Sequence, residues 1–107
     1  MEKIQFQLIG RNTPAAFIPI LVGVVGSGNL EVMIEPLADS PTCRVDVITS
    51  AQGFAPIWHA VMQDFQERHG LAGIAISIND MGATPAVVSL RLDQAAAALQ
   101  GLTKDNA

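Results

Sequence analysis

Charged residues are scarce in this chain, and positively charged ones are the scarcer kind. Only 15% of the 107 residues are charged, with six Lys and Arg against ten Asp and Glu, so the net charge is −4 when the histidines are neutral. The six cations are scattered along the chain from Lys3 to Lys104, whereas binding to nucleic acid requires clustered positive charge. We therefore expect no nucleic-acid partner.

Cysteine and long apolar runs are also in short supply. Cys43 is the single cysteine, so it has no partner for an internal disulfide, and no Cys/His pair stands at metal-ligand spacing. The longest apolar run, residues 17–25, has nine residues, whereas a membrane-spanning helix needs about 20. Glu2 and Lys3 come before any apolar stretch of useful length, so the pattern of a secretory signal is missing. We expect no metal site, no membrane span and a cytoplasmic protein.

Hydrophobic residues, in contrast, are plentiful. They make up 50% of the chain, far from the polar, highly charged composition of disordered segments. A chain of this length has room for one core. We expect a single domain over residues 1–107, with frayed ends at 1–3 and 101–107.

The first half of the chain has the patterns of β-strands. Residues 4–9 alternate between apolar and polar side chains, and so do residues 30–35 and 44–47. Residues 17–25 are continuously apolar, which is typical of a central strand covered on both faces, with Pro19 near its start. Residues 26–29 tolerate positive φ and predict a tight hairpin turn between two of these strands.

The second half changes to a helical period. Within residues 54–69, apolar side chains recur at helical spacing, with Pro56 suited to the first turn and Gly70 to the end. Residues 74–78 alternate again, so they predict a strand that is parallel to the one before the helix. Thr84-Pro85 is typical of the start of a second helix. Residues 88–92 also alternate with period two, so a strand is an alternative interpretation there. The expected fold is α+β: a mostly antiparallel sheet with one β-α-β crossover and a C-terminal helix packed on one face.

Candidate catalytic side chains are few. His59 and His69 lie on the polar side or end of the predicted first helix, where we expect them to be solvated. Cys43 is expected to be a structural thiol, and Asp80 to accept hydrogen bonds from backbone N–H groups at the start of the second helix. We assign no catalytic residue.

The tripeptide Gly26-Ser27-Gly28 has three candidate functions. A dinucleotide-binding loop would need a glycine at position 31, which is Glu31. A nucleophile elbow would need glycines at positions 25 and 29, which are Val25 and Asn29. The third function is an exposed hydroxyl that a separate enzyme modifies, and a plain turn is the alternative to all three.

Two sequence motifs carry a family resemblance. The first motif is Val25-Gly26-Ser27-Gly28-Asn29-Leu30-Glu31-Val32 with Glu35-Pro36, and the second is Asn79-Asp80-Met81-Gly82-Ala83-Thr84-Pro85 with Val87-Val88 and Leu90-Arg91-Leu92-Asp93-Gln94. Through these motifs the chain resembles the acyl carrier (delta) subunit of biotin-independent malonate decarboxylase. It resembles the acyl carrier (gamma) subunit of citrate lyase more loosely. It does not resemble the helical phosphopantetheine carriers, because its only Asp-Ser pair is followed by Pro41.

The resemblance implies a specific function. Ser27 would be esterified through phosphate to 2'-(5''-phosphoribosyl)-3'-dephospho-coenzyme A, with Gly26 and Gly28 forming the turn that exposes it. The thiol of this arm would carry acetyl and malonyl groups between an acetyl-CoA/malonate transferase subunit and decarboxylase subunits, after a prosthetic-group transferase has attached it. The alternatives are a carrier of a citrate lyase-type complex, a non-covalent scaffold and an independent small enzyme. Met33 and Leu90 are candidate docking contacts both for a carrier and for a scaffold.

Overall fold

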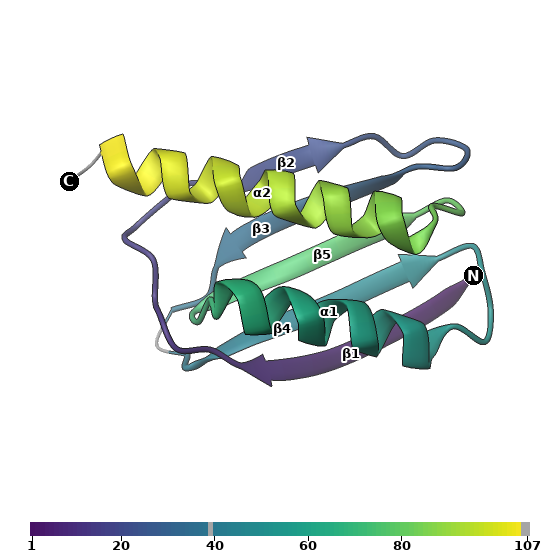
Figure 1. Ribbon diagram of the computed structural model, residues 1–107, viewed down its shortest axis with the longest axis horizontal. Coiled ribbons are helices and arrows are strands. Elements are labelled where there is room, and N and C mark those ends of the chain that lie inside the picture. Colours follow the sequence, from purple (N-terminus) through teal and green to yellow (C-terminus); the bar gives the residue numbers. More distant parts are fainter. Residues whose placement is uncertain (39, 106–107) are drawn as a thin grey trace.

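The computed structural model has a five-stranded sheet with two helices lying across one of its faces (Figure 1). It describes residues 1–38 and 40–105, the last five of these by their backbone only. The elements in chain order are β1 (Glu2–Ile9), β2 (Ile20–Gly23), β3 (Leu30–Pro36), β4 (Thr42–Thr49), α1 (Ala55–His69), β5 (Ile74–Asp80) and α2 (Pro85–Asp105).

The sheet is mixed, with the strand order β1-β4-β5-β3-β2. β4 and β5 are parallel and are joined through α1, whereas the other three neighbouring pairs are antiparallel. The predicted α+β class, the crossover and the hairpin between β2 and β3 are therefore confirmed. The end of the sheet where β4 and β5 finish is also the end where both helices begin (Figure 1).

The position predicted for the strand within residues 17–25 is wrong. Only Ile20–Gly23 forms a strand, and it lies at the edge of the sheet, while β5 takes the central place. Ile18 and Leu21 are 74% and 60% exposed, and Ile20 is the one buried residue of β2. Proline lacks the N–H that a central strand needs on its ladder, so Pro19 fits the approach to an edge strand. A continuous apolar run here indicates an exposed apolar surface rather than burial on both faces.

The core lies between the sheet and the two helices. Each inner strand contributes alternate residues to this layer, and the predicted helix faces meet them. The fully buried large side chains include Leu30, Val32, Ile34, Val45, Val47, Ile74, Ile76 and Ile78 from the sheet and Met62, Phe65, Leu92 and Leu99 from the helices. The helical period assigns Gln66 to the polar face, but the structure buries it. Its Nε2 is satisfied there, because it donates hydrogen bonds to the carbonyl oxygens of Ile9 (2.9 Å) and Leu71 (2.7 Å).

Local signals set the helix ends as predicted. Gly70 ends α1 in the left-handed conformation (φ +59°), where glycine carries no steric penalty. At the start of α2, Thr84 Oγ1 accepts a hydrogen bond from Val87 N (3.3 Å). Residues 88–92 lie inside α2, so the strand alternative is excluded there.

The described secondary structure reaches into both end segments, 1–3 and 101–107, and fraying there stays a prediction. β1 begins at Glu2, which pairs with Thr49, and α2 continues to Asp105. Residues 106–107 lie outside the described part. Neither α1 nor the described length of α2 is both long and apolar enough to cross a membrane.

Candidate functional site

Ser27 lies at the exposed tip of the hairpin that connects β2 to β3. The space on both sides of it is open: a Cβ atom added to Gly26 or Gly28 would meet no atom within 4 Å apart from those of its neighbours in the chain. Gly28 has φ +71°, a backbone conformation that L side chains rarely adopt. The two glycines therefore leave room around the Ser27 hydroxyl for a bulky substituent.

The backbone on the C-terminal side of Ser27 is anchored. Gly28 N donates to Met81 O (2.8 Å), and Met81 N donates to Asn29 O (3.0 Å). Asn29 N also closes the turn by donating to Gly26 O (3.0 Å). The exposed hydroxyl thus projects from a turn that is fixed to the loop between β5 and α2.

A positive charge lies close to this turn. Arg91, on α2, donates from Nε to Asn29 Oδ1 (3.3 Å) and from Nη1 to Gln94 Oε1 (2.9 Å). Arg44 and Arg68 form ion pairs with aspartates, whereas none of the ion pairs between described residues includes Arg91. Its charge is held beside the tip by neutral partners. The sequence offered no signal for this role, because 62 residues separate Arg91 from Asn29.

Apolar side chains are exposed along β2 and up to the tip. Ile18, Leu21, Val24 and Val25 are all more than half exposed. Isolated apolar residues on a surface are common, but a group of them along one sheet edge is typical of a protein interaction site. Leu90, which we expected as a docking contact, is also exposed on α2, whereas Met33 is only half-buried on the face that the helices leave open.

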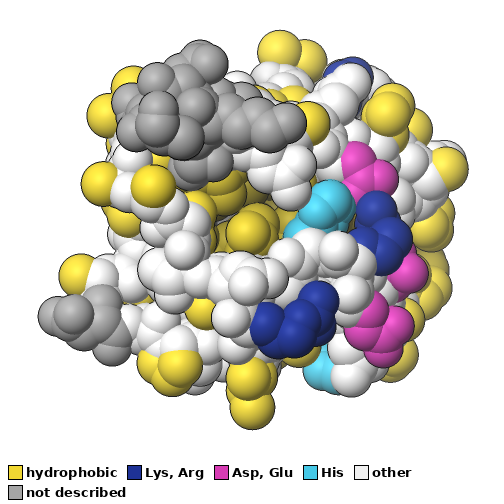
Figure 2. Space-filling model, turned by 60° about the vertical axis from the view of Figure 1, so that its left-hand side comes forward, with side chains coloured by type: hydrophobic (Ala, Val, Ile, Leu, Met, Phe, Trp, Pro, Cys, Tyr) yellow, Lys and Arg dark blue, Asp and Glu magenta, His cyan; other side chains and the backbone are white. Residues whose placement is uncertain are grey.

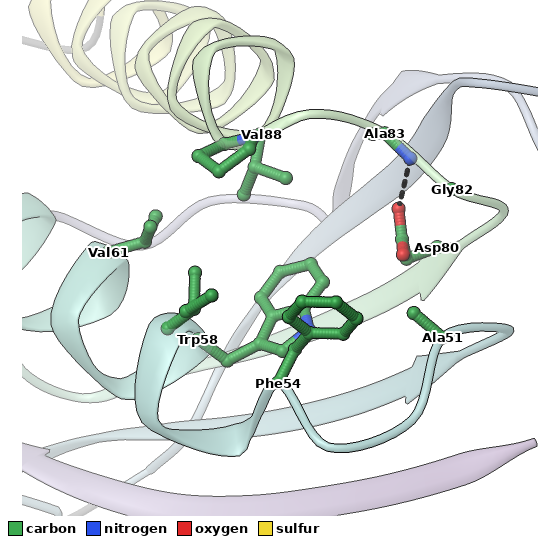
Figure 3. Close-up of a pocket in the computed structure, with 10 residues that line it drawn as sticks. Ala51, Phe54, Trp58, Val61, Asp80, Gly82, Ala83 and Val88 are labelled. Carbon is green, nitrogen blue, oxygen red and sulfur yellow. Dashed lines mark hydrogen bonds between the residues drawn. The ribbon is translucent and has the colours of Figure 1, made fainter.

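A cavity of about 270 Å³ opens between the N-terminal ends of the two helices and the loop after β5. Phe54 and Trp58 lie on its α1 side and Val88 on its α2 side, with Asp80 at one end (Figure 3). Its lining is apolar apart from Asp80 and backbone groups. The spacing of apolar residues predicted a packed helix face here and gave no indication of a cavity.

Asp80 has the structural role that we predicted. It is 3% exposed, and its Oδ1 accepts a hydrogen bond from Ala83 N (2.9 Å), drawn in Figure 3. Its Oδ2 accepts a second one from Thr49 Oγ1 (2.8 Å). These bonds fix the loop that opens α2.

The remaining chemical candidates lie away from Ser27. Cys43 is fully buried, and burial raises the pKa of its thiol to about 12, so the structural assignment is confirmed. His59 is exposed as expected. Among the described side chains, no histidine or carboxylate hydrogen-bonds to the Ser27 hydroxyl.

His69 is less solvated than predicted. Its side chain is 19% exposed, its ring packs against Phe65 (4.7 Å between centroids), and its Nε2 lies 3.2 Å from Asp93 Oδ1. Arg68 Nη1 binds the same carboxylate oxygen at 2.7 Å. On the side that Figure 2 brings forward, a histidine, a cation and acidic side chains lie side by side. This cluster links α1 to α2.

Comparison with known proteins gives a consistent result. The family model described as "Malonate decarboxylase delta subunit (MdcD)" matches residues 18–99. A relative from Burkholderia cepacia named malonate decarboxylase acyl carrier protein is 63% identical over 91% of this chain and 89% of its own length. One of the same name from Acinetobacter calcoaceticus is 46% identical over 94% of this chain and 99% of its own length.

A solved structure has the same fold. It is a chain of the crystal structure of a Pseudomonas malonate decarboxylase hetero-tetramer in complex with malonate, with a TM-score of 0.83 and 35% identity over 92% of this chain and 99% of that one. The likeness thus extends over almost the whole chain in both sequence and fold. The chain belongs to the malonate decarboxylase acyl carrier (delta subunit) family.

Proposed function

We propose that this chain is the acyl carrier subunit of a malonate decarboxylase complex, and that Ser27 is the attachment point of its prosthetic arm. The names of the relatives support the carrier function, and the hetero-tetramer supports assembly with other subunits. The exposed Ser27 hydroxyl on an anchored hairpin tip is the observation that carries the site assignment.

The residues at the tip fit the expected group. The arm is 2'-(5''-phosphoribosyl)-3'-dephospho-coenzyme A, which is large, and the open space beside Gly26 and Gly28 leaves its attachment point uncrowded. The phosphodiester on Ser27 would be negatively charged, and Arg91 supplies a positive charge at the same turn. None of the ion pairs between described residues neutralises this charge.

The division of chemistry follows from what the chain contains. When bound, the arm supplies a thiol that holds acetyl or malonyl groups as thioesters. The chain presents this group, and its own thiol on Cys43 is buried. The transferase and decarboxylase subunits then act on the acyl group, and a prosthetic-group transferase supplies the catalysis for attachment. Ser27 therefore needs no local base and this chain no catalytic residue.

Mass spectrometry tests the site directly. Chain purified from an active complex should carry one added group of the mass of the arm, on the peptide that contains Ser27. Ser27→Ala should lose both this mass and the activity of the complex while unfolding at an unchanged urea concentration. Ser50→Ala is the matched control, because Ser50 is an exposed turn serine at the same end of the sheet; it should keep the arm and the activity.

A docking module without an arm is the second candidate, and the exposed apolar edge of β2 favours it. Under that function Ser27→Ala would leave assembly and activity intact. Leu21→Ser would instead abolish copurification with the partner subunits. An unmodified Ser27 in active complex would decide for this alternative.

A further inference from the structure

The cavity between the helices and the hairpin tip belong to one end of the molecule. Gly28, next to Ser27, donates its N–H to Met81 O at 2.8 Å. Met81 lies between Asp80 and Gly82, which both line the cavity. Leu30, at the start of β3, also pairs with Asp80 across the sheet. A flexible group attached to Ser27 therefore begins beside the loop that forms the cavity wall (Figures 1 and 3).

The cavity suits a small uncharged group. Its volume of about 270 Å³ is close to the lower limit of ordinary ligand pockets, roughly 300 Å³. Phe54, Trp58, Val61 and Val88 give it apolar walls. An acetyl thioester loses little hydration there, whereas a malonyl thioester brings a carboxylate into an apolar space. That carboxylate would also meet the buried carboxylate of Asp80.

We propose that this cavity holds the acetyl thioester end of the arm on Ser27 and excludes the malonyl thioester. This inference rests on the function proposed above. The carrier then shields its acetyl group between encounters and presents its malonyl group to solvent and to the partner subunits. The selectivity comes from the charge of the load, because the two thioesters share the same arm.

A weak site is sufficient for this role. A flexible tether gives its free end an effective concentration in about the millimolar range. An intrinsic dissociation constant of the same size makes the acetyl end occupy the cavity about half of the time. The acetyl group thus remains available to the transferase, because it is free for the other half of the time.

The single tryptophan provides the readout. Because Trp58 is the one tryptophan of the chain, a ¹⁵N–¹H NMR spectrum has one indole N–H signal. Trp58 lines the cavity, so that signal reports on this site. We expect it to shift, together with the amides of Gly82 and Ala83, when the unmodified chain is compared with the acetyl-loaded chain. Amides at the opposite end of the sheet, such as that of Gly73, should stay unchanged. The bound fraction in the malonyl-loaded chain should be at least about tenfold lower.

Variants test whether the shift arises from the cavity. Ala51→Leu fills the cavity from its rim and should remove the shift, while Ala60→Leu, at an exposed position of α1 outside the cavity, should leave it unchanged. Ile57→Ser offers a variant with little risk to folding, because Ile57 is 44% exposed and lines the same space. It should reduce the shift without changing the unfolding midpoint.

The two proposals fail in different measurements. Absence of the arm mass on the Ser27 peptide overturns the proposed function. An acetyl-loaded chain with the correct mass but no change at Trp58, Gly82 and Ala83 overturns the cavity inference and leaves the carrier function standing. Equal shifts of these NMR signals in the acetyl-loaded and malonyl-loaded chains overturn the proposed selectivity of the cavity for the acetyl thioester.

Discussion

The N–H of Gly28 donates a hydrogen bond of 2.8 Å to the carbonyl oxygen of Met81, and this contact joins the hairpin tip to the loop that opens α2. It brings together two motifs more than 50 residues apart, one containing Ser27 and the other Asp80. The exposed hydroxyl, the Arg91 cation and the apolar cavity share one end of the molecule as a result.

Gly28→Ala should destabilise the hairpin tip. Its φ of +71° disfavours any L side chain, so we expect a loss of about 1–2 kcal/mol in the free energy of unfolding. Gly26→Ala is the control, because Gly26 has no positive φ and a Cβ there meets open space. Urea unfolding of the two variants measures the difference, and equal losses would contradict a left-handed Gly28.

Thr49→Val should be costly although it preserves side-chain volume. Thr49 is fully buried, and its hydroxyl donates to Asp80 Oδ2 (2.8 Å) and accepts from Ala51 N (3.1 Å). Removing it leaves a buried carboxylate oxygen without its donor, which costs about 1.5–3 kcal/mol. Thr13→Val, at an exposed loop position, should change stability by less than about 0.5 kcal/mol. Thermal unfolding of both variants checks the contrast.

The thiol of Cys43 should be unreactive in the folded chain. Burial raises its pKa from 9.0 to about 12, so about one thiol in ten thousand is ionised at pH 8. Ellman's reagent should find no fast thiol in the unmodified folded chain, one in the chain whose arm carries no acyl group, and one more after unfolding in urea. A fast thiol in the unmodified chain would contradict the burial of Cys43.

The same pKa shift predicts a pH dependence of stability. The folded chain holds the Cys43 proton more tightly than the unfolded chain does. Its contribution to the free energy of unfolding is therefore complete below pH 9 and is lost as the pH rises towards 12. A Cys43→Ala variant should show a flatter loss of stability over this alkaline range, measured by urea unfolding. A parallel loss in both proteins would contradict the assignment.

Asp93 should stabilise the contact between α1 and α2 except in strong acid. Burial by itself raises the pKa of Asp93, but hydrogen bonds and positive charge from Arg68 and His69 outweigh it, so the pKa lies below its ordinary 3.8. The contribution to stability is complete above pH 3.8 and is lost as the pH falls through the lower folded pKa. Asp93→Asn should therefore be less stable than the parent chain at pH 7 and approach it at the acidic end of a urea series. A constant gap down to the lowest pH would contradict the ionised pair.

Arg91→Gln should slow attachment of the arm. Loss of the cation beside the turn removes a charge-assisted contact to the phosphate, for which we expect about a tenfold lower rate at limiting precursor. Arg44→Gln is the matched control, because Arg44 pairs with Asp46 on the sheet. Both variants should unfold at similar urea concentrations. The rate of mass gain with the prosthetic-group transferase measures the effect, and equal rates would remove Arg91 from the site.

Much of the fold follows from local sequence signals. The helical period of α1, the glycine at residue 70 and the cap at Thr84 act within a few residues of themselves, so they can be inferred without a structure. The hairpin at residues 26–29 is determined in the same way, by residues that tolerate its backbone conformation. The placement of Ser27 on an exposed turn belongs to this group.

Other features depend on contacts between distant segments. Whether an apolar strand lies at the centre or the edge of a sheet depends on its neighbours, and the sequence of residues 17–25 does not contain that information. The burial of Gln66 likewise depends on carbonyl groups of β1 and of residue 71.

By itself, the sequence determined the serine, its flanking glycines and the family they belong to, because short motifs and turn chemistry are local. Only the tertiary structure decided that Arg91 and the cavity around Trp58 lie at the same end as that serine. The physical reason is that chain packing brings α2 and the β5–α2 loop against the hairpin. Contacts over more than 50 residues leave no periodic trace in the sequence.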